Sequence, residues 1–117
     1  MFRIYHNPLC RKSRAVLKYL QDQGIPVEVI EYMKKRLSEK DLEKLLIKLN
    51  LKPMDIIRTQ EDYYKKNLKG RKFNEHEWIR IIIQNPKLLK RPIIERDYKA
   101  VIGDPVSNID SILRTHI

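Results

Sequence analysis

The sequence holds a single cysteine, Cys10, among 117 residues. One cysteine cannot form an internal disulfide, so we expect a hydrophobic core to hold the fold without help from disulfides or metals. The three histidines, His6, His76 and His116, show no ligand spacing with it, so no structural zinc site is predicted. A lone unpaired thiol is typical of a reducing compartment, and we expect the cytoplasm.

Long apolar runs are absent as well. No stretch approaches the ~18 apolar residues that a membrane-spanning helix needs, and the N-terminus lacks the apolar core of a signal peptide. We therefore expect no membrane contact. Since neither an internal repeat nor a composition shift divides the chain, we predict one domain over residues 1–117.

Positively charged residues outnumber negatively charged ones. The chain has 25 Lys and Arg against 15 Asp and Glu, a formal net charge of +10. The cations are spread over many segments, with local concentrations at 34–36 and 65–72, and no nucleic-acid motif accompanies them. We therefore do not expect nucleic acid as a partner. A positive field does attract small oxyanions and acidic protein surfaces.

Cys10 lies where a predicted strand gives way to a predicted helix. Residues 2–5 alternate in polarity as in a half-buried strand, which Pro8 ends. Apolar residues then recur on one helical face as far as Gly24, which favours a helix end. The thiol is thus predicted at or just before a helix N-terminus, where unpaired backbone N–H groups stabilise an anion.

The neighbours of Cys10 indicate a reactive thiol. Arg11, Lys12, Arg14 and His6 add positive or ionisable groups, and such surroundings lower the pKa of a thiol. The alternative is a small buried cysteine without chemistry. The charged residues after Cys10 and the proline-containing turn before it favour the reactive thiol.

The following segments complete a βαβ unit and begin a helical insertion. Residues 25–30 read as a second strand, which closes a βαβ unit with parallel strands. Ser38 opens an amphipathic helix, and Pro53 begins a short helical turn that ends just before Arg58. The apolar face of the amphipathic helix consists of Leu42, Leu45, Leu46 and Leu49.

The second half reads as loop, helix, hairpin and helix. Residues 59–71 are polar, and we expect a loop with a helical turn or two. Asn74 opens a helix that residues 85–86 stop, with Trp78, Ile81 and Ile82 on its core face. Residues 91–102 indicate a β-hairpin, and Ser107 is expected to cap a last helix. The order predicts an α/β fold with a mixed four-stranded sheet: βαβ, a helical insertion at about 38–86, and ββα.

The run His6-Asn7-Pro8, then Cys10, then Ser13-Arg14 closely resembles the signature of the glutaredoxin-coupled arsenate reductase (ArsC) family. That family belongs to the thioredoxin-like superfamily and includes the Spx-type redox regulators of RNA polymerase. The resemblance continues through residues 32–34, 51–58, 85–86 and 91–93. It implies a thioredoxin-like fold and a thiol oxidoreductase that takes arsenate, binds no cofactor, and uses glutathione as co-substrate and glutaredoxin as partner.

Residues 10–13 have the form C-x-x-S, with Ser13 where a dithiol oxidoreductase would carry its second cysteine. A disulfide formed at Cys10 can therefore be resolved only by an external thiol, such as glutathione, glutaredoxin or another protein. For Ser13 itself, a hydroxyl in the first helical turn without chemistry is an equal alternative.

The resemblance also assigns roles far from the thiol. Guanidinium groups can hold an oxyanion and offset its charge, and two of the three family arginines map onto Arg58 and Arg91. Each could instead be a surface cation, and His6, which matches the histidine that helps to hold the thiol ionised, could instead bond only to backbone. The predicted site is therefore Cys10 and His6 as catalytic residues, Arg58, Arg91, Arg11, Ser13 and Arg14 as substrate-binding residues, and Pro92 as the cis-proline.

Asp104 departs from the family pattern. The third family arginine should precede the proline near the end of the last strand, where this chain has Gly103-Asp104-Pro105. An ionised carboxylate that points inward would repel an oxyanion, by roughly 4 kcal/mol at about 4 Å and an effective dielectric near 20. Alternatively, Asp104 faces solvent and caps the following helix.

Three functions therefore stay open. The first is a glutathione- and glutaredoxin-dependent arsenate reductase, and the second is an Spx-like regulator that binds RNA polymerase and uses Cys10 as a sensor. The third is a thiol oxidoreductase that acts on glutathionylated proteins. The missing second cysteine of a C-x-x-C switch disfavours the regulator, and Asp104 disfavours arsenate as substrate. We adopt the family-level reductase as the hypothesis.

Overall fold

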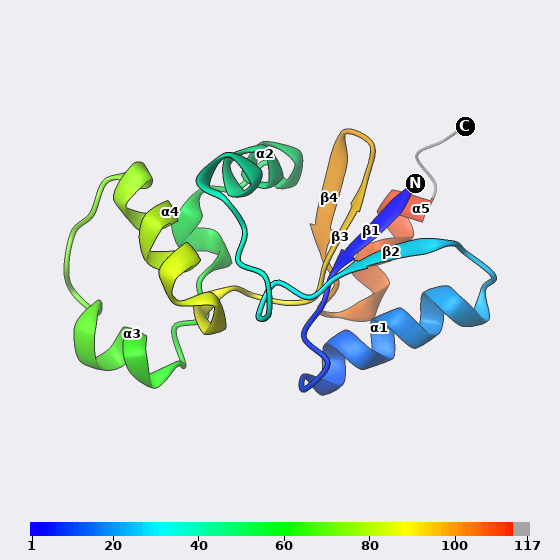
Figure 1. Cartoon of the computed structure of the whole chain (residues 1–117), viewed down its shortest axis with the longest axis horizontal. Helices are drawn as coiled ribbons and strands as arrows, with labels where there is room; N and C mark the ends of the chain where they lie inside the picture. The colour runs from blue at the N-terminus through cyan, green and yellow to red at the C-terminus, as the bar shows by residue number, and fades with distance from the viewer. Residues whose placement is uncertain (114–117) are drawn as a thin grey trace.

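The computed structural model describes residues 1–113 of the chain. A four-stranded sheet lies at its centre in the order β2-β1-β3-β4 (Figure 1). The strands are β1 (Phe2–Tyr5), β2 (Val27–Ile30), β3 (Ile93–Arg96) and β4 (Lys99–Ile102). β1 pairs with β2 in parallel, whereas β1 with β3 and β3 with β4 are antiparallel. The predicted mixed sheet is confirmed.

The helices follow the predicted order. α1 (Arg11–Asp22) connects β1 to β2, and α5 (Asp110–Leu113) follows β4. Between β2 and β3 the regular elements are helices: α2 (Glu39–Leu49), α3 (Asp62–Asn67) and α4 (Glu75–Gln84), with the 3₁₀ turns η1 (Pro53–Ile56) and η2 (Pro86–Leu88). In Figure 1, α3 and α4 extend away from the sheet. No helix within residues 1–113 has the length and hydropathy to cross a membrane.

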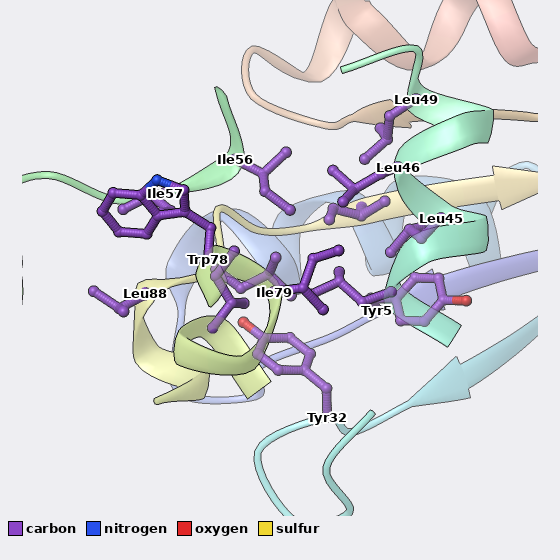
Figure 2. Close-up of a cluster of buried hydrophobic side chains, with 14 of the residues drawn as sticks. Tyr5, Tyr32, Leu45, Leu46, Leu49, Ile56, Ile57, Trp78, Ile79 and Leu88 are labelled. Carbon is purple, nitrogen blue, oxygen red and sulfur yellow. The ribbon is translucent and has the colours of Figure 1, made fainter. Parts of the chain in front are cut away.

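The sheet separates two hydrophobic cores. Side chains alternate between the faces of a strand, so Ile94 joins one core and its neighbour Ile93 joins the other. The core beside α1 and α5 contains Phe2, Ile4, Val16, Leu20, Ile94, Ile109 and Ile112. The core beside α2 and α4 (Figure 2) includes Tyr5, Tyr32, Leu42, Leu45, Leu46, Leu49, Trp78, Ile79, Ile82 and Ile93.

Two of the predicted helix starts are reciprocal capping boxes. The Ser38 hydroxyl accepts the Asp41 N–H at 3.0 Å, and the Asp41 carboxylate accepts the Ser38 N–H at 3.3 Å. Asn74 and Glu77 exchange the corresponding bonds at 2.8 and 2.9 Å. Each box satisfies two backbone N–H donors that a helix start otherwise leaves unpaired.

The predicted cap at Ser107 is wrong. A 3₁₀ turn, η3 (Val106–Ile109), precedes α5, and Pro105 occupies its N-cap position. Proline fits there because it has no N–H group that needs a partner. Ser107 therefore lies inside the turn, and no side chain caps it.

Gly103 directly follows β4 and contacts the segment that precedes β3. Its N–H donates to the Pro92 carbonyl at 2.8 Å. A Cβ atom at this position would lie 2.7 Å from Ile94 Cδ1 and 3.1 Å from Pro92 Cγ, closer than packed carbons allow. The lack of a side chain therefore lets β4 end directly against the segment that contains Pro92.

We predict that Gly103→Ala lowers the free energy of unfolding by about 1–3 kcal/mol, because the added methyl group overpacks this contact. Chemical denaturation measures the change. Ile94→Val alone should cost about 0.5–1.5 kcal/mol. Because it removes Cδ1, it should recover part of the loss when combined with Gly103→Ala. Strictly additive losses in the double variant would show that this contact is not the cause.

Candidate active site

The turn that leads into α1 is held by the buried residue Asn7. Its side-chain oxygen accepts the Leu9 N–H at 3.0 Å, its carbonyl accepts the Cys10 N–H at 2.9 Å, and its own N–H donates to the Ser13 hydroxyl at 3.3 Å. An asparagine oxygen that bonds backbone two residues on is typical of a turn. These bonds fix Cys10 at the N-cap position of α1.

The side chains of Ser13 and Arg14 bond to this turn and do not line the pocket beside the thiol. Ser13 is fully buried, and its hydroxyl serves as the acceptor for Asn7. The Arg14 guanidinium donates to the Pro8 carbonyl at 2.9 Å. Neither side chain lines the pocket beside Cys10, so both are placed to support the turn.

The thiol of Cys10 is partly exposed, and its surroundings favour the thiolate. Burial alone would raise its pKa. The backbone N–H of Ser13, the guanidinium of Arg91 and the backbone N–H of Lys12 together outweigh burial and leave the pKa of Cys10 below its ordinary value. The first turn of α1 thus supplies the anion-stabilising groups that its N-terminus is expected to supply.

Arg91 reaches the thiol from the segment before β3. The Arg91–Pro92 peptide bond is cis, and Pro92 is buried. One guanidinium nitrogen of Arg91 donates to the Lys87 carbonyl at 3.1 Å. Its Nε atom is buried without a hydrogen-bond partner in the described part of the chain. One terminal nitrogen of the Arg91 guanidinium is therefore bonded to the backbone, while its Nε–H group remains as an unpaired donor among the described residues.

Arg58 is held near the thiol by backbone hydrogen bonds between two loops. Ile57 and Leu89 form an isolated antiparallel bridge, the Arg58 N–H donates to the Leu88 carbonyl at 2.7 Å, and the Lys90 N–H donates to the Ile56 carbonyl at 2.8 Å. The Arg58 side chain pairs with Glu61 at 2.5 Å. The helical insertion thus contributes one cation, Arg58, to the thiol site through this bridge.

Together these segments enclose a pocket of about 490 Å³ beside the thiol. Five of its lining side chains are cationic and one is a carboxylate, so the pocket suits an anion. The lining consists of Cys10, Arg11, Lys12, Arg58, Gln60, Lys90, Arg91, Ile102, Asp104 and Asn108. Of the predicted substrate-binding residues, Arg11, Arg58 and Arg91 line it.

His6 lies at the end of β1 and is only 5% exposed. Its backbone N–H donates to the Ile30 carbonyl at 2.8 Å, and its Nδ1 atom has no hydrogen-bond partner among residues 1–113. Burial lowers the pKa of His6, which favours the neutral imidazole. His6 is not among the residues that line the pocket beside Cys10, so its catalytic role stays a prediction.

Asp104 lines the pocket and remains exposed to solvent, but it does not cap the next helix, where Pro105 holds the N-cap position. Its Oδ2 atom lies 2.6 Å from Lys12 Nζ. The Asn108 amide fixes the backbone here by donating to the Asp104 and Ile102 carbonyls at 3.2 and 3.0 Å. The ammonium group of Lys12 therefore offsets the carboxylate that stands where the family pattern has an arginine.

Three residues that line the pocket had no signal in the sequence, and a fourth residue near the thiol, Tyr32, lies in a segment that only the family resemblance marked. Lys90, Gln60 and Asn108 line the pocket, but nothing in their local patterns distinguishes them from other loop residues. Tyr32 is wholly buried, and its hydroxyl has no partner within the described chain (Figure 2). Burial raises the pKa of Tyr32 to about 12, and charges on Arg91 and Cys10 also act on it.

Within residues 1–113, no three or more His, Cys, Asp or Glu side chains are grouped so that they could bind a metal ion. His116 lies outside the described residues.

Sequence and structure comparisons identify relatives of this chain. The model of the ArsC family matches residues 5–112. Arsenate reductases of Neisseria meningitidis and Haemophilus influenzae are 35% and 34% identical to it; the alignments cover 95% and 94% of this chain and 97% of each relative.

The structure of the arsenate reductase from Vibrio cholerae superposes with a TM-score of 0.90 at 34% identity, and covers 95% of this chain and 96% of that one. This similarity confirms the predicted thioredoxin-like fold with its mixed four-stranded sheet. A family model that spans nearly the whole chain and relatives that agree over the same length lead to one conclusion: the chain belongs to the ArsC family.

Proposed function

We propose that this chain is an arsenate reductase in which Cys10 is the nucleophile, glutathione is the co-substrate and glutaredoxin restores the thiol. One observation carries the proposal: a thiol with a lowered pKa opens onto a pocket with five cationic side chains. The names of the relatives from Neisseria, Haemophilus and Vibrio support arsenate as the oxyanion. Since glutathione is kept reduced in the cytoplasm, the proposal places the protein there.

In the first step the Cys10 thiolate attacks arsenic and forms an S–As bond, and one oxygen leaves as water once it is protonated. Arg58 and Arg91 hold the remaining oxygens. Guanidinium groups suit this role because they bind oxyanions in bidentate fashion and offset the repulsion between two anions. Lys90 and Arg11 add charge at the edges of the pocket.

In the second step glutathione joins the adduct. When an S–S bond forms between Cys10 and glutathione, the electron pair of the S–As bond passes to arsenic, which leaves as arsenite. One arsenic acid and two thiols thus give one arsenous acid, one disulfide and one water. Because C-x-x-S offers no second thiol, a glutaredoxin thiolate then attacks the mixed disulfide and frees Cys10.

A second candidate keeps the thiol chemistry but replaces arsenate with a glutathionylated protein. The observation that favours it is the Asp104 carboxylate inside the pocket, which reduces the charge available for an oxyanion. The regulator that binds RNA polymerase gains no support from the relatives.

We predict that iodoacetamide alkylation of Cys10, followed against pH, has its midpoint below that of a free cysteine thiol, because the thiolate is the reacting form. Arg91→Gln should move the midpoint upward, since it removes a positive charge that favours the thiolate. Arg80→Gln is the matched control, because Arg80 is exposed and pairs with Glu39 on the far helices. A native midpoint at the free-thiol value would contradict an activated cysteine.

We predict that arsenate drives NADPH oxidation when glutathione, glutaredoxin and glutathione reductase are supplied, and that Cys10→Ser abolishes it. Arg91→Gln should reduce turnover by about 10²–10³, the usual loss for one preorganised donor, whereas Arg80→Gln should not change it. Full activity in Cys10→Ser would refute the mechanism. A native protein that does not reduce arsenate but reduces a glutathionylated peptide through Cys10, with glutathione and glutathione reductase and without glutaredoxin, would establish the second candidate instead.

A further inference from the structure

The pocket contains an ion pair that the reduction of an oxyanion does not require. Lys12 Nζ lies 2.6 Å from Asp104 Oδ2, and both side chains line the pocket with Cys10. The side chains are 63% and 41% exposed, so solvent reaches both charged groups. An exposed ion pair contributes little to stability, and a ligand can therefore separate the two groups at small cost.

An ammonium and a carboxylate side by side complement a ligand that carries the same two groups in reverse. An α-amino acid group with both its ammonium and its carboxylate free is such a ligand, because each of its charges meets an opposite charge. Of these two residues, a simple oxyanion could use only Lys12, and it would face repulsion from Asp104. The pair therefore favours a zwitterionic ligand over a bare anion.

We propose that Lys12 and Asp104 bind the γ-glutamyl end of glutathione, Asp104 at the α-ammonium and Lys12 at the α-carboxylate. This inference rests on the proposed function, in which glutathione is the thiol that reacts at Cys10. The γ-linkage leaves both α-groups of glutathione free, as the pair requires. Asp104 is then a specificity residue for the thiol co-substrate.

The positions of the two residues fit this role. Lys12 is two residues after Cys10 in the first turn of α1, and Asp104 follows Gly103, whose N–H is bonded to Pro92. The elements that flank the thiol therefore also hold the ion pair. The pocket, at about 490 Å³, lies within the range of about 300–1,000 Å³ that small-ligand sites occupy. Because Arg58 and Arg91 hold the arsenate oxygens in the proposed reaction, Arg11 and Lys90 are left for the carboxylate at the glycine end.

The test follows one exchange reaction at the only cysteine of the chain. Cys10 is first converted to its mixed disulfide with thionitrobenzoate. An attacking thiolate then forms an S–S bond to Cys10 and expels the coloured thionitrobenzoate anion, whose low pKa makes it the better leaving group. The release rate against thiol concentration reports how well each thiol is recognised. Arsenate is not present.

Three thiols with the same cysteinylglycine part are compared. They are glutathione, its deamino form (glutaryl-cysteinylglycine) and its decarboxylated form (γ-aminobutyryl-cysteinylglycine). The native protein should react with glutathione about tenfold faster than with either analogue at low concentration, because each analogue lacks one charge-assisted hydrogen bond. Ratios between thiols are read within each protein, so a general change in Cys10 reactivity cancels.

Two variants should separate the two contacts. Asp104→Asn should lose the preference for glutathione over the deamino form but keep the preference over the decarboxylated form. Lys12→Gln should show the opposite pattern. Asp22→Asn is the matched control, since Asp22 forms a similar exposed pair with Lys18 at 2.9 Å on the outer part of α1. It should keep both native ratios.

A native ratio near one for both analogues overturns the inference, and so does Asp104→Asn with an unchanged preference over the deamino form. Either result can occur in a protein that reduces arsenate well, and would leave the proposed function intact. Conversely, the native preference and its loss in the two variants can be observed in a protein that shows no arsenate turnover. The failure of one proposal is thus distinguishable from the failure of the other.

Discussion

The chemistry of this molecule depends on the attraction between a thiolate at Cys10 and the positive groups that two separate segments bring to it. The first turn of α1 supplies backbone N–H groups, and the segment before β3 supplies the guanidinium of Arg91. These segments meet because β1 and β3 are neighbours in the sheet, with Tyr5 opposite Ile93, so the end of β1 lies beside the start of β3. The sheet register therefore determines the distance between thiol and guanidinium, and the turn held by Asn7 determines where the thiol lies.

The helical insertion and the end of β4 complete the pocket from two other directions. The bridge between Ile57 and Leu89 brings in Arg58 and Lys90, which add charge for an anion. The end of β4 brings in Asp104, which removes some of that charge and pairs with Lys12. The same pocket thus combines a region suited to an oxyanion with a region suited to a zwitterion, and this division matches a reaction between an oxyanion and an amino-acid thiol.

Much of the fold could be predicted because its signals are local. The alternation in β1, the helix end at Gly24, which has a φ of +71°, and the capping boxes at Ser38 and Asn74 all act within a few residues. The predictions failed where contacts with neighbouring elements determine which side chain is buried or which residue caps a helix. Ile81 packs against the core as expected, but the more deeply buried Ile79 was not predicted there, and Pro105 occupies the N-cap position expected for Ser107. The ion pair between Lys12 and Asp104 joins residues 92 positions apart, and no local pattern could indicate it.

In the proposed reaction, Cys10 transfers electrons to arsenate and is left in a disulfide with the external thiol. Mass spectrometry of the peptide that contains Cys10, after incubation with arsenate and glutathione but without glutaredoxin, tests it most directly. We expect a Cys10–glutathione disulfide that accumulates only when arsenate is present and disappears when glutaredoxin is added. A Cys10 thiol that stays free under these conditions, or a disulfide that forms equally without arsenate, would contradict it.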